Sequence, residues 1–137
     1  MATLVDTNVL IDIAAKDAAW HEWSRKRLAE RHRTGPLFIN QIVFSEFSYR
    51  YDTMEEVEAV LPADVFIRRQ LPWRAAFAAA RAFRRYREDG GTRERILPDF
   101  MIGAHAVIAG ISILSRDTSL YRRYFPTVSL IAPDTHP

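Results

Sequence analysis

The sequence predicts an α/β fold in which a parallel sheet of about five strands is flanked by helices on both faces. Short apolar runs alternate with helix-like segments along all 137 residues. Strands separated by helices normally pair in parallel, so this order favours a parallel sheet over hairpins. The length suits one core and no linker or repeat divides the chain, so residues 1–137 are expected to form a single domain.

The strands are predicted from short runs of apolar residues, several of them β-branched. The first run leads directly into Asp6, and the second follows the Thr34-Gly35-Pro36 break. The expected strands are residues 2–5, 37–39, 65–67, 111–114 and 127–131.

The helices are predicted from capping residues and from proline and glycine. Thr7 or Asn8 is expected to cap the first helix, Asn40 the third, and Thr53 a short fourth that starts with a capping box. Proline or glycine bounds the later helices, at Pro72, Gly90-Gly91, Pro98 and Gly110. The expected helices are residues 9–16, 17–32, 41 onward, 54–61, 73–87 and 99–109.

Composition excludes some classes of protein. Cysteine is absent, which excludes disulfides and thiolate metal sites. No apolar stretch is long enough to cross a bilayer and no signal peptide pattern is present, so a cytoplasmic protein without a membrane partner is expected. The net charge is +2, and Lys16 and Lys26 are the only lysines, so the positive charge is nearly all arginine. Arginine suits phosphate, although codon bias in a GC-rich genome gives the same composition.

Four acidic residues fall where a parallel sheet would bring them together. Asp6 ends the first strand, Asp117 closely follows the fourth, Asp99 lies in the first turn of its helix, and Glu46 lies in the second turn of its helix. In such folds ligands bind outside the carboxyl ends of the strands, where the following helices also begin. These four side chains are therefore expected to face one cleft.

Carboxylates grouped in this way repel one another unless a cation lies between them, and oxygen ligands suit Mg²⁺ or Mn²⁺. Such a cation acidifies a bound water and neutralises charge on a phosphate, so phosphodiester hydrolysis is the expected chemistry. Taken singly, each residue has an equally good structural explanation without a metal site. Asp6 and Asp99 could be helix caps, Glu46 a surface acid and Asp117 a turn residue. Their common place at one sheet edge favours the site.

Four segments resemble the motifs of PIN-domain ribonucleases. They are Leu4-Val5-Asp6-Thr7-Asn8-Val9-Leu10-Ile11-Asp12, Ser45-Glu46-Phe47, Pro98-Asp99-Phe100-Met101-Ile102-Gly103-Ala104-His105-Ala106 and Leu114-Ser115-Arg116-Asp117. The resemblance spans nearly the whole chain, and the length is similar to that of VapC toxins of bacterial toxin–antitoxin pairs. It implies a single PIN-like domain.

The resemblance also implies a Mg²⁺- or Mn²⁺-dependent endoribonuclease. Asp6, Glu46, Asp99 and Asp117 match the catalytic, metal-binding acids, and Asn8 and Ser115 match polar residues that support them. The implied partners are structured RNA with single-stranded loops, such as tRNA or rRNA, a VapB-type antitoxin and a second copy in a homodimer. The acids alone do not separate RNA from DNA or other phosphoesters, so a DNA nuclease or phosphatase stays open. A non-catalytic RNA- or protein-binding module is a further alternative, which the intact acids argue against.

Arginines supply candidate substrate contacts. Arg84 and Arg85 lie in a basic stretch near the end of a long helix, where an RNA backbone or merely solvent would face them. Arg116 adjoins Asp117 and could contact substrate or balance charge.

Other polar and aromatic residues are assigned no catalytic part. His105 departs from the family pattern and is expected to be a helix-face or core residue, and Asp12 is expected to face solvent. Trp20 and Trp23 suit the core and a partner surface equally.

Overall fold

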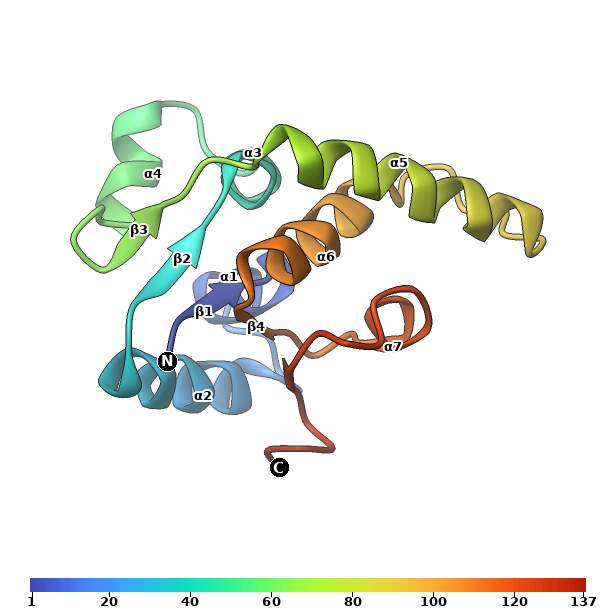
Figure 1. The fold of residues 1–137 in the computed structure, drawn as a ribbon. Coiled ribbons are helices and arrows are strands. Elements are labelled where there is room, and N and C mark those ends of the chain that lie inside the picture. Colours follow the sequence, from blue (N-terminus) through green and yellow to red (C-terminus); the bar gives the residue numbers. More distant parts are fainter.

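The computed structural model describes residues 1–137 and contains a five-stranded, all-parallel sheet in the order β3-β2-β1-β4-β5 (Figure 1). The strands are β1 Thr3–Val5, β2 Leu37–Ile39, β3 Phe66–Arg68, β4 Ser112–Leu114 and β5 Leu130–Ile131. Helices lie on both faces of the sheet, and the predicted fold class is confirmed. No helix combines the length and the apolar character that crossing a membrane requires.

Seven helices connect the strands, one more than the sequence analysis predicted. They are α1 Thr7–Ala14, α2 His21–Thr34, α3 Gln41–Ser48, α4 Met54–Val60, α5 Trp73–Glu88, α6 Leu97–Ala109 and α7 Ser119–Tyr124. The additional helix is α7, which has only six residues and no side-chain cap at its start. Its N-cap position is Thr118, a residue type that favours caps, but the side chain makes no capping hydrogen bond.

Three of the predicted helix boundaries are confirmed by their caps. The side chain of Asn40 accepts a hydrogen bond from Val43 N at 3.0 Å, and that of Thr53 accepts one from Glu56 N at 3.2 Å. Gly110 ends α6 in the left-handed conformation, with φ of 67°, which favours glycine.

The predicted starts of the first two helices were wrong. Asp6, rather than Thr7 or Asn8, caps α1, because Asp6 Oδ1 accepts the Thr7 N–H at 2.8 Å. Asp17 does cap a turn through Ala19 N and Trp20 N, but α2 itself begins only at His21.

The strands at the two edges of the sheet also differ from the prediction. β3 is shifted one residue toward the C-terminus, and β5 is limited to Leu130–Ile131. β5 pairs only with β4, through Ile113 with Leu130 and Leu114 with Ile131.

The core surrounds the central strands. Leu4, Val5, Ile113 and Leu114 are fully buried, as expected where helices cover both faces of a parallel sheet. His105 of α6 is fully buried too, and its Nδ1 lies 3.0 Å from Asn40 Nδ2. The predicted core role of His105 is therefore confirmed.

Candidate functional site

The four predicted acids line a single cleft at the carboxyl edge of the sheet. Its volume is about 610 Å³. The lining residues are Asp6, Thr7, Asn8, Ile11, Ser45, Glu46, Tyr49, Arg95, Asp99 and Asp117. They come from the residue after β1, from α1, from α3 and the residue after it, from α6 and the loop before it, and from the loop after β4. The parallel order of the strands thus brings together carboxylates that are up to 111 residues apart in the sequence.

Asp6 lies at the base of this cleft and both of its carboxylate oxygens are held. Besides the bond from Thr7 N to Oδ1, Oδ2 accepts the hydroxyls of Ser115 at 2.8 Å and Tyr121 at 2.7 Å. Burial raises the pKa of Asp6 to about 6, and these hydrogen bonds oppose part of that rise. Asp6 therefore combines the two roles considered from the sequence, since it caps a helix and also lines the cleft.

The pKa of Asp99 shows most clearly that the carboxylates of the cleft repel one another. Its pKa is raised to about 7, first by burial and then by the negative charges of Asp6 and Glu46. Asp117 adds to the rise, and the positive charge of Arg93 opposes it. This repulsion between like charges favours the binding of a proton or another cation in the cleft.

Glu46 and Asp117 occupy the more open part of the site. Glu46 is half-buried, and its Oε1 accepts the Thr7 hydroxyl at 2.8 Å. Asp117 is exposed, and its backbone N–H donates to Ser115 Oγ at 3.2 Å.

Asn8 and Ser115 join α1 to the loop after β4. Asn8 Nδ2 donates to Ser115 Oγ at 3.0 Å, and Asn8 Oδ1 accepts the Arg116 N–H at 3.3 Å. Ser115 is fully buried, and its hydroxyl donates a hydrogen bond to Asp6 Oδ2. Neither residue is arranged as a separate reactive group, and both hold the carboxylates in place.

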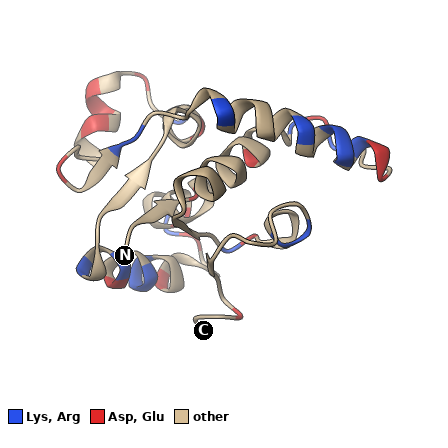
Figure 2. Ribbon diagram, viewed as in Figure 1, with Lys and Arg blue, Asp and Glu red and all other residues tan.

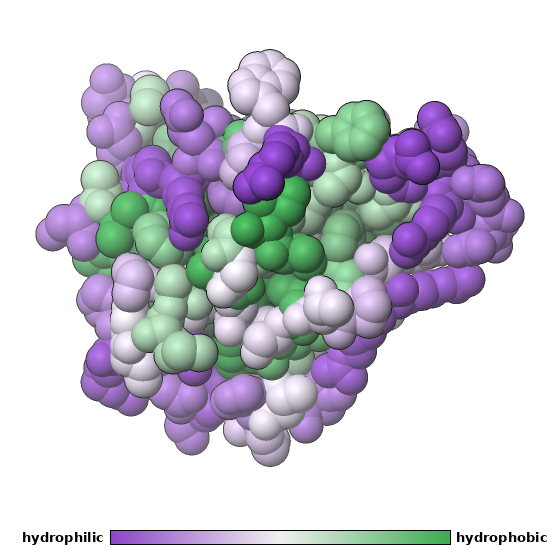
Figure 3. Space-filling view, viewed as in Figure 1, coloured by the Kyte–Doolittle hydropathy of each residue, from purple (hydrophilic) through white to green (hydrophobic).

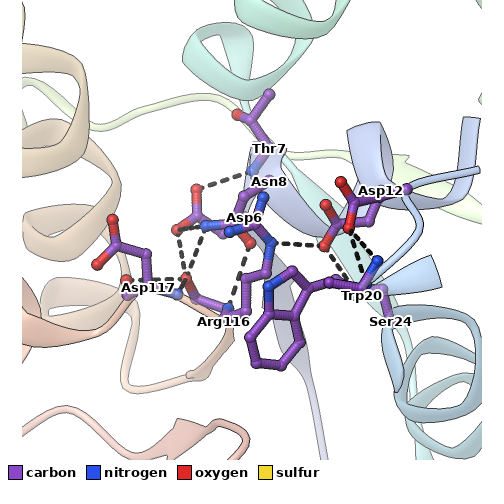
Figure 4. Close-up of polar contacts among 11 residues, drawn as sticks. Asp6, Thr7, Asn8, Asp12, Trp20, Ser24, Arg116 and Asp117 are labelled. Carbon is purple, nitrogen blue, oxygen red and sulfur yellow. Dashed lines mark hydrogen bonds and ion pairs between the residues drawn. The ribbon is translucent and has the colours of Figure 1, made fainter. Parts of the chain in front are cut away.

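The side chain of Arg116 does not line the cleft. Its Nε donates to Asp12 Oδ2 at 2.7 Å, and its guanidinium lies 5.7 Å from the centre of the Trp20 ring (Figure 4). Asp12 is buried, with its side chain 1% exposed, and it also accepts the Ser24 hydroxyl at 2.8 Å. The expectation that Asp12 faces solvent was wrong, because two donors inside the chain replace water around its carboxylate.

The two tryptophans that the sequence left open are half-buried and contact each other edge to face at 6.1 Å. Trp23 Nε1 donates to the backbone oxygen of His136, which ties the C-terminal segment to α2. Both rings therefore make contacts within the chain.

Arg84 and Arg85 are exposed on α5 but lie outside the cleft lining, and Arg85 is 5.8 Å from the Tyr124 ring centre. Figure 2 shows the basic residues gathered toward the C-terminal half of α5. From the same basic stretch, Arg95 lines the cleft and Arg93 lines a smaller hollow behind it.

Tyr121 and Tyr49 line these hollows and were not predicted there. Tyr121 lies on α7, which the sequence did not reveal, and it is buried against Asp6. Tyr49 follows α3 by one residue and is 91% exposed at the cleft. Its position three residues after Glu46, on the same side of a helix, is the one signal that could have indicated it.

The donor chemistry of the cleft fits a divalent cation. No three acidic or histidine side chains are close enough together to form a ready-made metal cage. Mg²⁺ does not need one, because it keeps several waters and commonly takes only one or two carboxylates. Four carboxylates on one cleft, with mutual repulsion that raises the pKa of Asp99, provide that set.

Comparison with known proteins places the chain in a family. The family model described as PIN domain matches residues 3–126. No curated protein matches the sequence significantly.

Several solved structures share the fold at low sequence identity. VapBC2 from Rickettsia felis, bound to a DNA fragment from its promoter, has a TM-score of 0.73 and 15% identity, over 96% of this chain and 98% of that chain. VapBC-1 from nontypeable Haemophilus influenzae has a TM-score of 0.72 and 16% identity, over the same shares. FitAcB from Neisseria gonorrhoeae has a TM-score of 0.71 and 17% identity, over 98% and 99%. With the PIN model covering most of its length, this chain belongs to the PIN-domain family.

Proposed function

We propose that this protein is a metal-dependent endoribonuclease that acts as the toxin of a type II toxin–antitoxin module. The observation that carries the proposal is the single cleft lined by four carboxylates, one of which, Asp99, has its pKa raised to about 7 by burial and by the charges of the others. A cleft of this charge repels a phosphodiester unless a cation is present, so the arrangement suits metal-dependent phosphoester chemistry. RNA is favoured over DNA and other phosphoesters by the family resemblance rather than by the cleft.

The catalytic and metal-binding role is assigned to Asp6, Glu46, Asp99 and Asp117. Mg²⁺ or Mn²⁺ bound there supplies an acidified water and offsets the charge of the phosphate. Ser115 and Tyr121 fix the orientation of Asp6 through its Oδ2, and Asn8 fixes Ser115.

Arginines are assigned to the substrate backbone. Arg95 lines the cleft and so is nearest to a bound phosphate, with Arg93 in the adjoining hollow. Arg84 and Arg85 are exposed further along α5, where they suit outer contacts with an extended RNA. Arg116 is assigned to holding the loop that carries Ser115 and Asp117, since its guanidinium is bound to Asp12.

The proposed partners are a VapB-type antitoxin, a second copy of the chain, and structured RNA with single-stranded loops such as tRNA or rRNA, all in the cytoplasm. Structures of similar fold are complexes whose names join a VapC with a VapB protein, which supports the antitoxin. Apolar residues reach the surface on the face shown in Figure 3. On α5, Trp73 is 90% exposed and Phe77 67%, and they are one helical turn apart. A patch of this kind supports pairing between copies.

The test is a cleavage assay with structured RNA, single-stranded DNA and a simple aryl phosphate, each with Mg²⁺, Mn²⁺ or EDTA. RNA should be cut only with metal, and Asp6→Asn or Asp99→Asn should abolish cutting. Asp64→Asn is the matched control, because Asp64 is exposed and outside the cleft. Cutting of DNA or the aryl phosphate alone would overturn the RNA assignment, and activity retained in both cleft variants would overturn the site.

A further inference from the structure

A second hollow opens beside the acidic cleft. Its volume is about 300 Å³, at the lower end of the range for small-ligand sites. It lies at the carboxyl ends of β2 and β3, next to the start of α3 and α4. Ser45 of α3 lines both hollows, so a ligand that extends out of the acidic cleft on this side enters the second one.

The second hollow is positively charged where the first is negative. Arg68 and Arg69 line it, and neither forms an ion pair, although other arginines of the chain do. The guanidinium of Arg68 lies 5.4 Å from the centre of the Phe44 ring, and that of Arg69 lies 5.1 Å from the centre of the Phe38 ring. A guanidinium that stacks by its face keeps N–H groups at its edge for an anion, although one N–H of Arg68 is used by Phe66 O at 2.8 Å.

The rest of the wall combines an aromatic surface with unused hydrogen-bonding groups. Phe44 and the 62%-exposed Met54 provide apolar contact. The side chains of Ser45 and Gln70 make no hydrogen bond within the chain, whereas the Gln41 side chain is used by Leu71 N. The free hydroxyl and amide are thus available to a ligand that carries both donors and acceptors.

We propose that this hollow is a subsite for one nucleotide of single-stranded RNA, next to the nucleotide that bears the cleaved phosphate. Arg68 and Arg69 take the phosphate, Phe44 and Met54 contact the base, and Gln70 reaches its hydrogen-bonding edge. The inference rests on the proposed nuclease function, and it adds the direction in which the RNA strand leaves the acidic cleft. A polynucleotide fits because it carries an anion at each step between flat, partly apolar bases. This matches two guanidinium groups that have no counter-charge in the chain, one of them over the Phe44 ring.

The test compares charge removal inside the subsite with equal charge removal elsewhere. Arg68→Gln/Arg69→Gln is made in the non-cleaving Asp99→Asn protein, and binding of a fluorescent single-stranded RNA is measured by anisotropy over a range of salt concentrations. Lys26→Gln/Arg33→Gln is the control, because both residues are exposed on α2 and line neither hollow.

The subsite variant should bind RNA about tenfold more weakly, and its slope of log Kd against log salt should fall by about 0.7, the contribution of the one single-strand phosphate that Arg68 and Arg69 no longer neutralise. The control should keep the slope of the parent. Equal losses in both variants would overturn the subsite, since they would show only an effect of net charge. Unchanged RNA binding with weakened antitoxin binding would also overturn it and would assign the hollow to a protein partner.

A second measurement does not depend on whether the double variant folds. RNA carrying one 4-thiouridine next to the cleaved position is photocrosslinked to the Asp99→Asn protein, and crosslinked peptides are identified by mass spectrometry. Crosslinks within residues 41–54 or 68–70 support the subsite, and crosslinks confined to other segments overturn it. Metal-dependent RNA cleavage by the unmodified protein separates the two claims. If the unmodified protein cleaves RNA but the binding and crosslinking results are negative, only the subsite is overturned. If the protein neither binds nor cleaves RNA, the nuclease function and the subsite are both overturned.

Discussion

Replacing Asp99 by asparagine should stabilise the metal-free protein at alkaline pH. Asparagine has nearly the same shape but cannot ionise, so it removes both the cost of burying a charge and the repulsion from the other carboxylates, without leaving a cavity. The pKa of Asp99 is raised from 3.8 to about 7, and a shift of about three units corresponds to about 4 kcal/mol. Asp99 is only half-buried, so solvent screening reduces the expected gain to roughly 2 kcal/mol.

The sign of this effect sets the pH range in which to look for it. The folded-state pKa of Asp99 lies above the unfolded value, so the protonated carboxyl favours the folded state. This contribution is complete below about pH 4 and is lost as the pH rises through about 7. The two proteins should therefore be similarly stable at pH 4 and differ most at pH 8.

The assay is urea unfolding in EDTA at pH values from 4 to 8, with Asp64→Asn as the exposed control. The free energy of unfolding of Asp99→Asn should exceed that of the unmodified protein by roughly 2 kcal/mol at pH 8. If the two proteins have equal stability at pH 8, or if their difference is the same at pH 4, the carboxylate is not held in a repulsive cluster and the reasoning fails.

Three further outcomes are expected. Tyr121→Phe removes a hydrogen bond that favours ionised Asp6, so the pKa of Asp6 should rise above about 6. The acidic limb of the pH–rate profile should therefore move to higher pH. The control Tyr51→Phe should leave that limb unchanged. Arg116→Gln leaves the buried Asp12 carboxylate without its counter-charge, so it should lower the free energy of unfolding by roughly 2 kcal/mol in urea titrations. Adding Asp12→Asn to this variant should restore part of the lost stability. Mg²⁺ at ten times its Kd should stabilise the unmodified protein at pH 8 by about 1.4 kcal/mol in calorimetry, and stabilise Asp99→Asn less.

The sequence was sufficient to predict where the four carboxylates meet, because each lies at or close to the end of a strand or the start of a helix that local signals mark. Asp6 follows an apolar strand directly, and Asp99 follows a proline at the start of a helix. The parallel order of the strands then fixes which edge of the sheet they share. This part of the prediction required no knowledge of side-chain packing.

The parts that the sequence missed depend on contacts between distant segments. Asp12 is buried because Arg116, 104 positions later, reaches it, and nothing local marks that pair. Tyr121 reaches Asp6 from a helix of six residues that has no capping side chain. Helix periodicity and capping rules describe single segments, so neither contact could be inferred from them.

The order of the strands also bears on when the cleft can form during synthesis. β1 lies between β2 and β4, so the first and second halves of the chain meet along the β1–β4 pair. The first half carries Asp6 and Glu46, and the second carries Asp99 and Asp117. A nascent polypeptide whose emerged part ends before Ser112 therefore lacks β4 and Asp117 and displays only part of this acidic set. Emergence of β4 and of the loop after it, rather than folding of the first half, is the step that completes the acidic set of the cleft.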